Sequence, residues 1–134
     1  METERAKQRQ VMNLSQNERM AVFNFLKVMV WADGKLDAKE RIIAMLEPIR
    51  MGVDPSELEE FEQEASKLEF SDALEAIAHM NAENKKFTAA LLGAAMYVDG
   101  EVDEEELKLW RFVTEICSLP TMTVKEASEY MANL

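Results

Sequence analysis

The sequence predicts an all-α fold, a compact bundle of seven or eight helices. Good helix formers (Ala, Glu, Leu, Met and Lys) are abundant, whereas the 134 residues include only four glycines and three prolines. No stretch alternates apolar and polar residues over the length of a strand, so we expect no sheet. Hydrophobic residues make up 48% of the chain, which suffices for a core and argues against disorder.

A short motif occurs twice, 66 residues apart. Residues 31–40 are Trp-Ala-Asp-Gly-Lys-Leu-Asp-Ala-Lys-Glu, and residues 97–106 are Tyr-Val-Asp-Gly-Glu-Val-Asp-Glu-Glu-Glu. The surrounding residues 15–53 align with residues 81–119 without a gap. We therefore expect one domain over residues 1–134 with an internal pseudo-two-fold repeat, whose units span about 15–68 and 81–134.

The first helix of each unit is expected at the centre of the bundle. Residues 20–31 contain only two polar residues, Asn24 and Lys27, and residues 87–97 contain only one, Thr88. Helices that are apolar on nearly every side are typical of a protein interior. These two helices should therefore pack on each other.

Small side chains give the second central helix a thin face, since residues 89, 90 and 93–95 are all Ala or Gly. We expect the first helix to approach this face closely, with larger aromatic side chains such as Phe23 and Phe25 filling the space around it. Ser15 and Asn81 are suited to cap the starts of the two helices.

The second helix of each unit is preceded by residues that are typical of a helix N-terminus. Asp37 with Glu40, and Asp103 with Glu106, have the Asp-x-x-Glu spacing of a capping box. A glycine three residues before each signal is suited to end the preceding helix. The residues expected to face inward on these second helices are Ile42, Ile43, Leu46, Ile49, Leu107, Leu109, Phe112, Val113 and Ile116.

Further helices complete the bundle. Asp54 and Pro55 open a helix that should extend to about residue 68, Ser71 opens a short helix to about residue 80, and Thr123 opens the last one. A helix over residues 2–12 is also expected.

The formal net charge of −11, from 26 acidic and 15 basic residues, limits the possible partners. It argues against nucleic acid and against anchoring on an anionic membrane. Direct membrane insertion is not expected either, because the longest mainly apolar run, residues 87–98, is shorter than the ~20 residues of a span. A cation or a basic protein fits the charge better. The acidic run 57–64 is expected to be a solvated face, with a docked basic partner as the alternative.

Cys117 is the only cysteine and His79 the only histidine. The chain can form no internal disulfide, which is typical of a reducing, cytoplasmic protein. Cys117 is expected in the core and His79 at a partly buried helix end. A multi-histidine zinc or di-iron site is excluded, and no phosphate-binding loop or nucleophile elbow is present. We expect that the protein is not an enzyme.

The candidate site is the pair of Asp-Gly loops. Its proposed ligands are Asp33, Asp37 and Glu40 in the first loop, and Asp99, Asp103 and Glu106 in the second. Oxygen-rich acidic loops suit hard cations such as Ca²⁺ or Mg²⁺, although the spacing is not that of an EF-hand. In the alternative interpretation the glycines end helices and the acids only cap them. The two roles are compatible, because a capping carboxylate keeps a free lone pair.

The two loops differ in charge. Lys35 and Lys39 lie among the acids of the first loop, whereas the second adds three glutamates, at positions 101, 104 and 105. Crowded carboxylates repel one another unless they are solvated or neutralised. Any cation should therefore prefer the second loop.

Both copies of the motif resemble the loops of the TerB-like (tellurite-resistance protein B) family. Each repeat of that family carries Ala-Asp-Gly-x-hydrophobic-x-x-x-Glu between helices, as residues 32–40 do here and, with Val98 replacing Ala, residues 98–106. The resemblance extends over about residues 15–119. It implies a compact helical domain of a cytoplasmic bacterial protein linked to tellurite resistance and stress, with metal binding or a membrane-associated protein partner.

Two functional hypotheses follow. In the first, the chain is a non-enzymatic TerB-like domain whose loops bind a divalent cation in ion sensing. In the second, it is a protein–protein interaction or scaffold module without metal. The sequence leaves the ion, the partner and the oligomeric state open.

Overall fold

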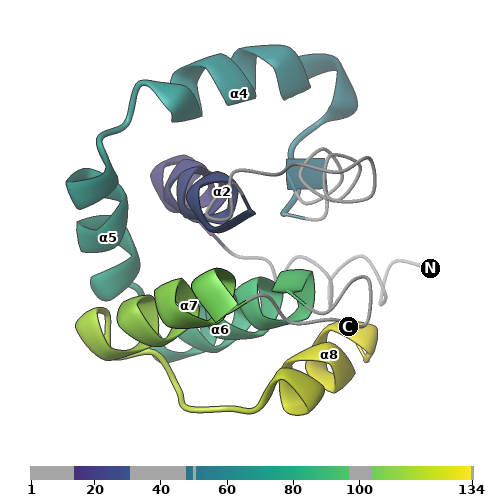
Figure 1. The fold of residues 1–134 in the computed structure, drawn as a ribbon. Coiled ribbons are helices and arrows are strands. Elements are labelled where there is room, and N and C mark those ends of the chain that lie inside the picture. Colours follow the sequence, from purple (N-terminus) through teal and green to yellow (C-terminus); the bar gives the residue numbers. More distant parts are fainter. Residues whose placement is uncertain (1–13, 31–47, 50, 97–103, 134) are drawn as a thin grey trace.

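The computed structural model describes residues 14–30, 48–49, 51–96 and 104–133 (Figure 1). This part of the chain contains six α-helices and one short 3₁₀ helix, without any strand, which confirms the all-α class. The elements are α2 (Gln16–Val30), η1 (Pro55–Glu57), α4 (Leu58–Ser66), α5 (Phe70–Ala78), α6 (Ala82–Met96), α7 (Glu104–Ile116) and α8 (Val124–Ala132). The helix count of the whole chain and the two-fold repeat remain predictions.

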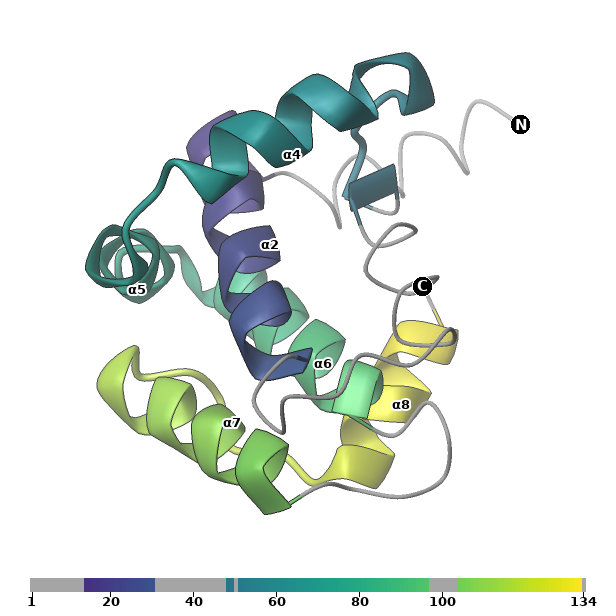
Figure 2. The same cartoon turned by 45° about the horizontal axis from the view of Figure 1, so that its top comes forward.

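The helices α2 and α6 are the most buried elements, as their composition predicts. α2 is packed against α4, α5 and α7, whereas α6 lies mainly along α8 (Figures 1 and 2). The two helices begin at Gln16 and Ala82, which are 66 positions apart. This offset equals that of the sequence motif. None of the helices in the described ranges is long and apolar enough to cross a membrane.

At Gly93, the glycine of its thin face, α6 does not contact α2. A Cβ placed on Gly93 would lie 2.7 Å from Cβ of Ala127 in α8 and 2.9 Å from Cζ2 of Trp110 in α7. The expectation that α2 fills this position is therefore wrong. The small residue admits α8 and the indole ring instead, because α6 packs along α8 far more extensively than along α2.

The helix caps predicted at Ser15, Asn81 and Thr123 are present, whereas those predicted at Asp37 and Asp103 lie outside the described residues. The Ser15 hydroxyl accepts from the Glu18 amide at 3.1 Å, and the Glu18 carboxylate accepts from the Ser15 amide at 2.9 Å. Asn81 accepts from the Asn84 amide at 2.8 Å. Thr123 forms a reciprocal capping box at the start of α8. Such caps satisfy amides that have no partner inside the helix. The start of α5 differs, because it begins at Phe70 and its N-cap forms no side-chain hydrogen bond.

Two residues of α7 that were expected to face inward are exposed. Val113 is buried as expected, but Phe112 is 41% and Ile116 is 56% exposed. The buried face instead contains Glu106 and Trp110. The indole Nε1 donates to the backbone carbonyl of Ala89 at 3.3 Å, which satisfies its polar atom inside the protein. Because Trp110 turns this face inward, Phe112 and Ile116 remain on the outside of the helix.

Asn24 joins two elements from within the apolar helix α2. Its side-chain amide donates to the carbonyl of Ala65 at 3.0 Å, near the end of α4, and to the carbonyl of Leu68 at 3.1 Å, just after the helix. We expect Asn24→Ala to lower the free energy of unfolding by about 1–2 kcal/mol, since both carbonyls lose a partly buried donor. Urea denaturation followed by circular dichroism measures this. Asn17→Ala, at an exposed position of the same helix, is the control, and an equal loss there would contradict the assignment.

Candidate functional site

Most of the predicted cation ligands lie outside the described residues, namely Asp33, Asp37, Glu40, Asp99 and Asp103. Glu106 is described. It is the third residue of α7 and only 5% exposed, although exposed carboxylates are the rule in the first turn of a helix. A buried carboxylate requires a partner, and Glu106 has one. The capping box predicted for Asp103 and Glu106 is not tested, because Asp103 lies outside the described residues.

The described residues offer no other place for a metal ion. Among them, no three His, Cys, Asp or Glu side chains come together in a way that could hold one. Cation binding therefore depends on the two Asp-Gly loops and stays a prediction.

Cys117 and His79, the only cysteine and the only histidine of the sequence, lie in different surroundings. Cys117 is buried, and its Sγ donates to the carbonyl of Leu74 at 3.3 Å. Burial raises the pKa of the Cys117 thiol, which disfavours the reactive thiolate. His79 follows the end of α5, and its Nδ1 lies 2.8 Å from the carbonyl oxygen of Glu75. Cys117 is thus a core residue, as predicted, whereas His79 is exposed rather than partly buried.

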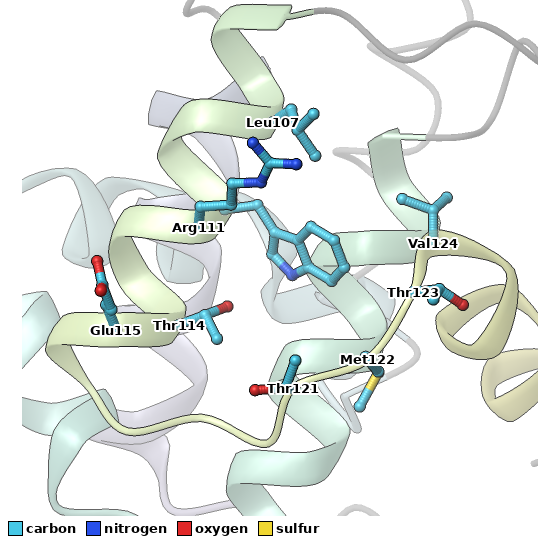
Figure 3. A pocket seen from close by; sticks show the side chains of 9 residues that line it. Leu107, Arg111, Thr114, Glu115, Thr121, Met122, Thr123 and Val124 are labelled. Carbon is cyan, nitrogen blue, oxygen red and sulfur yellow. The ribbon is translucent and has the colours of Figure 1, made fainter.

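A groove lies between α7 and the start of α8, and we call it the α7–α8 groove. Its volume is about 580 Å³. Figure 3 shows the side chains from α7 on one side and those of residues 121–124 on the other. It is lined by Leu107, Trp110, Arg111, Thr114, Glu115, Thr121, Met122, Thr123 and Val124.

The second wall of the groove exists because the chain turns sharply after α7. Ser118 adopts a left-handed conformation with φ 54°, and the amide of Leu119 donates to the carbonyl of Thr114 at 2.9 Å. This 6→1 hydrogen bond closes the end of the helix. Pro120 follows, and no regular helix forms until the capping box of Thr123 starts α8. The intervening segment lies opposite α7.

The floor of the groove is apolar. Trp110 is 7% exposed, and its polar atom is already bonded inside the protein. Leu107, Met122 and Val124 are half-buried and pack on the main core. These side chains have no hydrogen-bonding group to offer, so apolar contact is the interaction that the floor can make.

The rim of the groove is charged. Arg111 and Glu115 are both exposed and lie one turn apart, yet no ion pair joins them. Figure 3 shows Arg111 beside Leu107, with Glu115 at another edge of the groove. Of the two other bases on α7 and α8, Lys108 lies 3.4 Å from the Glu105 carboxylate and Lys125 lies 4.0 Å from a second glutamate.

A smaller hollow of about 280 Å³ lies between the start of α2 and α4. Arg19 and three glutamates of the acidic run line it, at positions 57, 60 and 64. Those glutamates are exposed, which agrees with the solvated face predicted for the run. Glu64 pairs with Lys67 at 3.0 Å, while the buried Nε of Arg19 has no hydrogen-bond partner in the described structure.

Sequence reasoning did not identify the α7–α8 groove. Trp110 and Met122 were assigned no role, since isolated large apolar residues are ordinary in a helical protein. The available signal was Pro120 between two apolar segments, which marks a turn but does not show that the segments face each other.

No protein-family model matches the chain, and no curated protein matches it. A solved structure does match, the crystal structure of the protein of unknown function PG1108 from Porphyromonas gingivalis W83. The two chains are 38% identical, and the match covers 90% of this chain and 98% of the other, with a TM-score of 0.80. The two proteins are therefore similar in sequence as well as in fold. Because the function of PG1108 is unknown, the match indicates no activity.

Proposed function

We propose that this chain, which belongs to the same family as PG1108, is a non-enzymatic TerB-like helical domain whose Asp-Gly loops bind a divalent cation. The observation that carries the proposal is the repeated acidic motif of residues 31–40 and 97–106. Carboxylate oxygens concentrated in short loops are the ligands that Ca²⁺ and Mg²⁺ prefer. Its role would be ion sensing related to stress or tellurite resistance, which is what the resemblance to the TerB-like family implies.

The positions of the two motifs support this proposal. α2 is described to Val30 and α6 to Met96, so each motif directly follows the described part of a central helix. α7 begins at Glu104, within the second motif. Each loop therefore follows one of the two central helices. A rigid, buried helix can hold the ligands of a cation site in a fixed position. The only thiol is buried and hydrogen-bonded, which supports a non-enzymatic role.

We expect Ca²⁺, Mg²⁺ or Mn²⁺ to raise the melting temperature. A cation at one hundred times its Kd adds about 2.7 kcal/mol to the free energy of unfolding. Differential scanning calorimetry across a metal titration measures the shift. Asp99→Asn with Asp103→Asn should abolish it.

The matched control is Asp33→Asn with Asp37→Asn, which should reduce the shift less, since lysines already moderate the first loop. Equal effects of the two pairs would overturn the preference for the second loop. An unchanged melting temperature at millimolar metal would rule out cation binding.

The second candidate function is a protein–protein interaction module, in which the loop acids only cap helices. The α7–α8 groove favours it, and Phe112 and Ile116 are exposed on another face of the same helix. Exposed apolar surface is a common feature of protein-binding sites. This candidate predicts partner binding that does not depend on metal.

A further inference from the structure

We propose that the outer face of α7 forms the interface of a homodimer, in which the α7 helices of two copies of the chain pack antiparallel about a two-fold axis near Phe112. The inference goes beyond the proposed function, because it concerns another surface and requires no cation. The apolar side chains exposed on this face, the charges along its edge and the register in which both match support it.

Apolar surface is concentrated on one face of α7. Phe112 is 41% and Ile116 is 56% exposed, and they are two of the four large apolar side chains that are exposed in the described ranges. Leu109, one turn before Phe112, is only partly buried. Helical geometry places the three within about 60° of one another around the helix axis, and we call them the α7 stripe. Because α7 lies at the periphery of the bundle (Figure 2), another molecule can reach this stripe.

Two opposite charges lie along one edge of the α7 stripe. Lys108 and Glu115 are both exposed, and helical geometry places them on the same side of the stripe, about 70–90° around the helix from its centre. Charged residues beside the apolar seam of a coiled coil occupy equivalent positions and pair between helices.

Neither charge is held firmly within one copy. In the described part of the chain Glu115 forms no ion pair, and Lys108 lies 3.4 Å from the carboxylate of Glu105 one turn away. An exposed ion pair of this kind contributes little to stability, because water screens it and both long side chains lose freedom. Lys108 can therefore exchange Glu105 for a carboxylate of a second copy.

The stripe and its charged edge match their own reversed sequence. In an antiparallel pair with a two-fold axis near Phe112, residues equally far before and after this position face each other. Leu109 of each copy then lies opposite Ile116 of the other, to within about one residue of the same register.

The charges fit the same register. Lys108 of each copy lies opposite Glu115 of the other, to within about one residue. The two-fold axis keeps the charged edges of both helices on one side of the interface, so two Lys–Glu pairs form beside the apolar contact. A match between a helix and its own reversed sequence favours a second copy of the chain over an unrelated protein.

The expected dimer is weak, because one helix pair is a small interface. The 13 residues of α7 extend for about 20 Å. Interfaces that bury less than about 1,200 Å² in total are typical of weak or transient complexes. The net charge of −11 also makes two copies repel each other. We therefore expect a Kd of about 0.1 mM, so that the chain is mainly monomeric at low micromolar concentration.

Sedimentation equilibrium of the full chain between about 5 µM and about 1 mM measures the association. We expect the average mass to rise from that of a monomer towards that of a dimer. A chelator is present throughout, so the result does not depend on cation binding by the loops and is separate from the test of the proposed function. A monomer over the whole range would overturn the proposal.

The apolar contact is tested with Phe112→Glu. Two carboxylates would then meet at the two-fold axis, and the Kd should rise at least about tenfold. Gln63→Glu adds one negative charge at an exposed position of α4, which packs on α2 and η1, and should leave the Kd within about twofold. Melting curves verify that both variants fold. Equal effects of the two variants would contradict the interface.

The register is tested with two charge reversals. Lys108→Glu places two glutamates at each pair and Glu115→Lys places two lysines there, so each variant alone should dimerise at least about threefold more weakly than the natural chain. An equimolar mixture of the two should form a heterodimer, because a glutamate of one variant then faces a lysine of the other at both pairs. Its Kd should return to within about twofold of the natural value.

The matched control is the mixture of Lys67→Glu with Glu64→Lys, which reverses the charges of the exposed ion pair on α4 in the same way. This mixture should associate no more tightly than either of its members. The antiparallel register is overturned if mixing the α7 variants restores no association. It is also overturned if the α4 mixture gains as much as the α7 mixture, because association would then respond only to total charge.

Discussion

Phe25→Ala is expected to lower the free energy of unfolding by about 3–5 kcal/mol. Phe25 has no exposed surface, and its ring stacks on Phe70 with the ring centres 5.6 Å apart. Removing it leaves a cavity between α2 and α5, two helices that pack extensively on each other. A domain of this size is stable by only about 5–15 kcal/mol, so this single loss is a large part of the total.

Urea denaturation followed by circular dichroism provides the measurement. Phe112→Ala is the matched control, because it removes the same atoms from a side chain that is 41% exposed. We expect the control to cost about 0.5 kcal/mol or less, as surface substitutions usually do. If both variants lost the same stability, the faces assigned to α7 and α2 would be wrong.

These two phenylalanines also show where sequence reasoning succeeded and where it failed. In residues 20–31 nearly every position is apolar, so any orientation of the helix buries Phe25, and the prediction depended on no choice of face. α7 offered two overlapping stripes. The one with more apolar residues contains Phe112 and Ile116, but the buried one contains Glu106 and Trp110. A glutamate argues against an inward face unless its buried partner is known, and a sequence does not show that partner.

The candidate sites differ in the same way. The Asp-Gly loops could be proposed from the sequence because their motif occurs twice in it, and such a repetition is visible without any structure. The α7–α8 groove could not, because its second wall depends on the left-handed conformation of Ser118. That conformation is uncommon for a residue other than glycine, asparagine or aspartate, and no residue pattern predicted it here. Local signals did predict the cap at Thr123, since capping depends on neighbours within three residues.

Gly93→Leu should lower the free energy of unfolding by about 3 kcal/mol or more. Even the first carbon of the new side chain would lie 2.7 Å from Cβ of Ala127, and this atom is fixed to the backbone of α8. Glycine normally weakens a helix by about 1 kcal/mol relative to alanine, so its place in the middle of α6 is explained by packing rather than by helix propensity. Thermal and urea denaturation of the variant give the value.

The smaller change Gly93→Ala isolates the contact that causes this loss. Ala127→Gly removes the opposing Cβ, so in the double variant the closest clash is gone, while the contact with Trp110 at 2.9 Å remains. We expect the double variant to be about 1 kcal/mol more stable than the sum of the single effects predicts. Strict additivity would show that α6 and α8 do not meet at these residues.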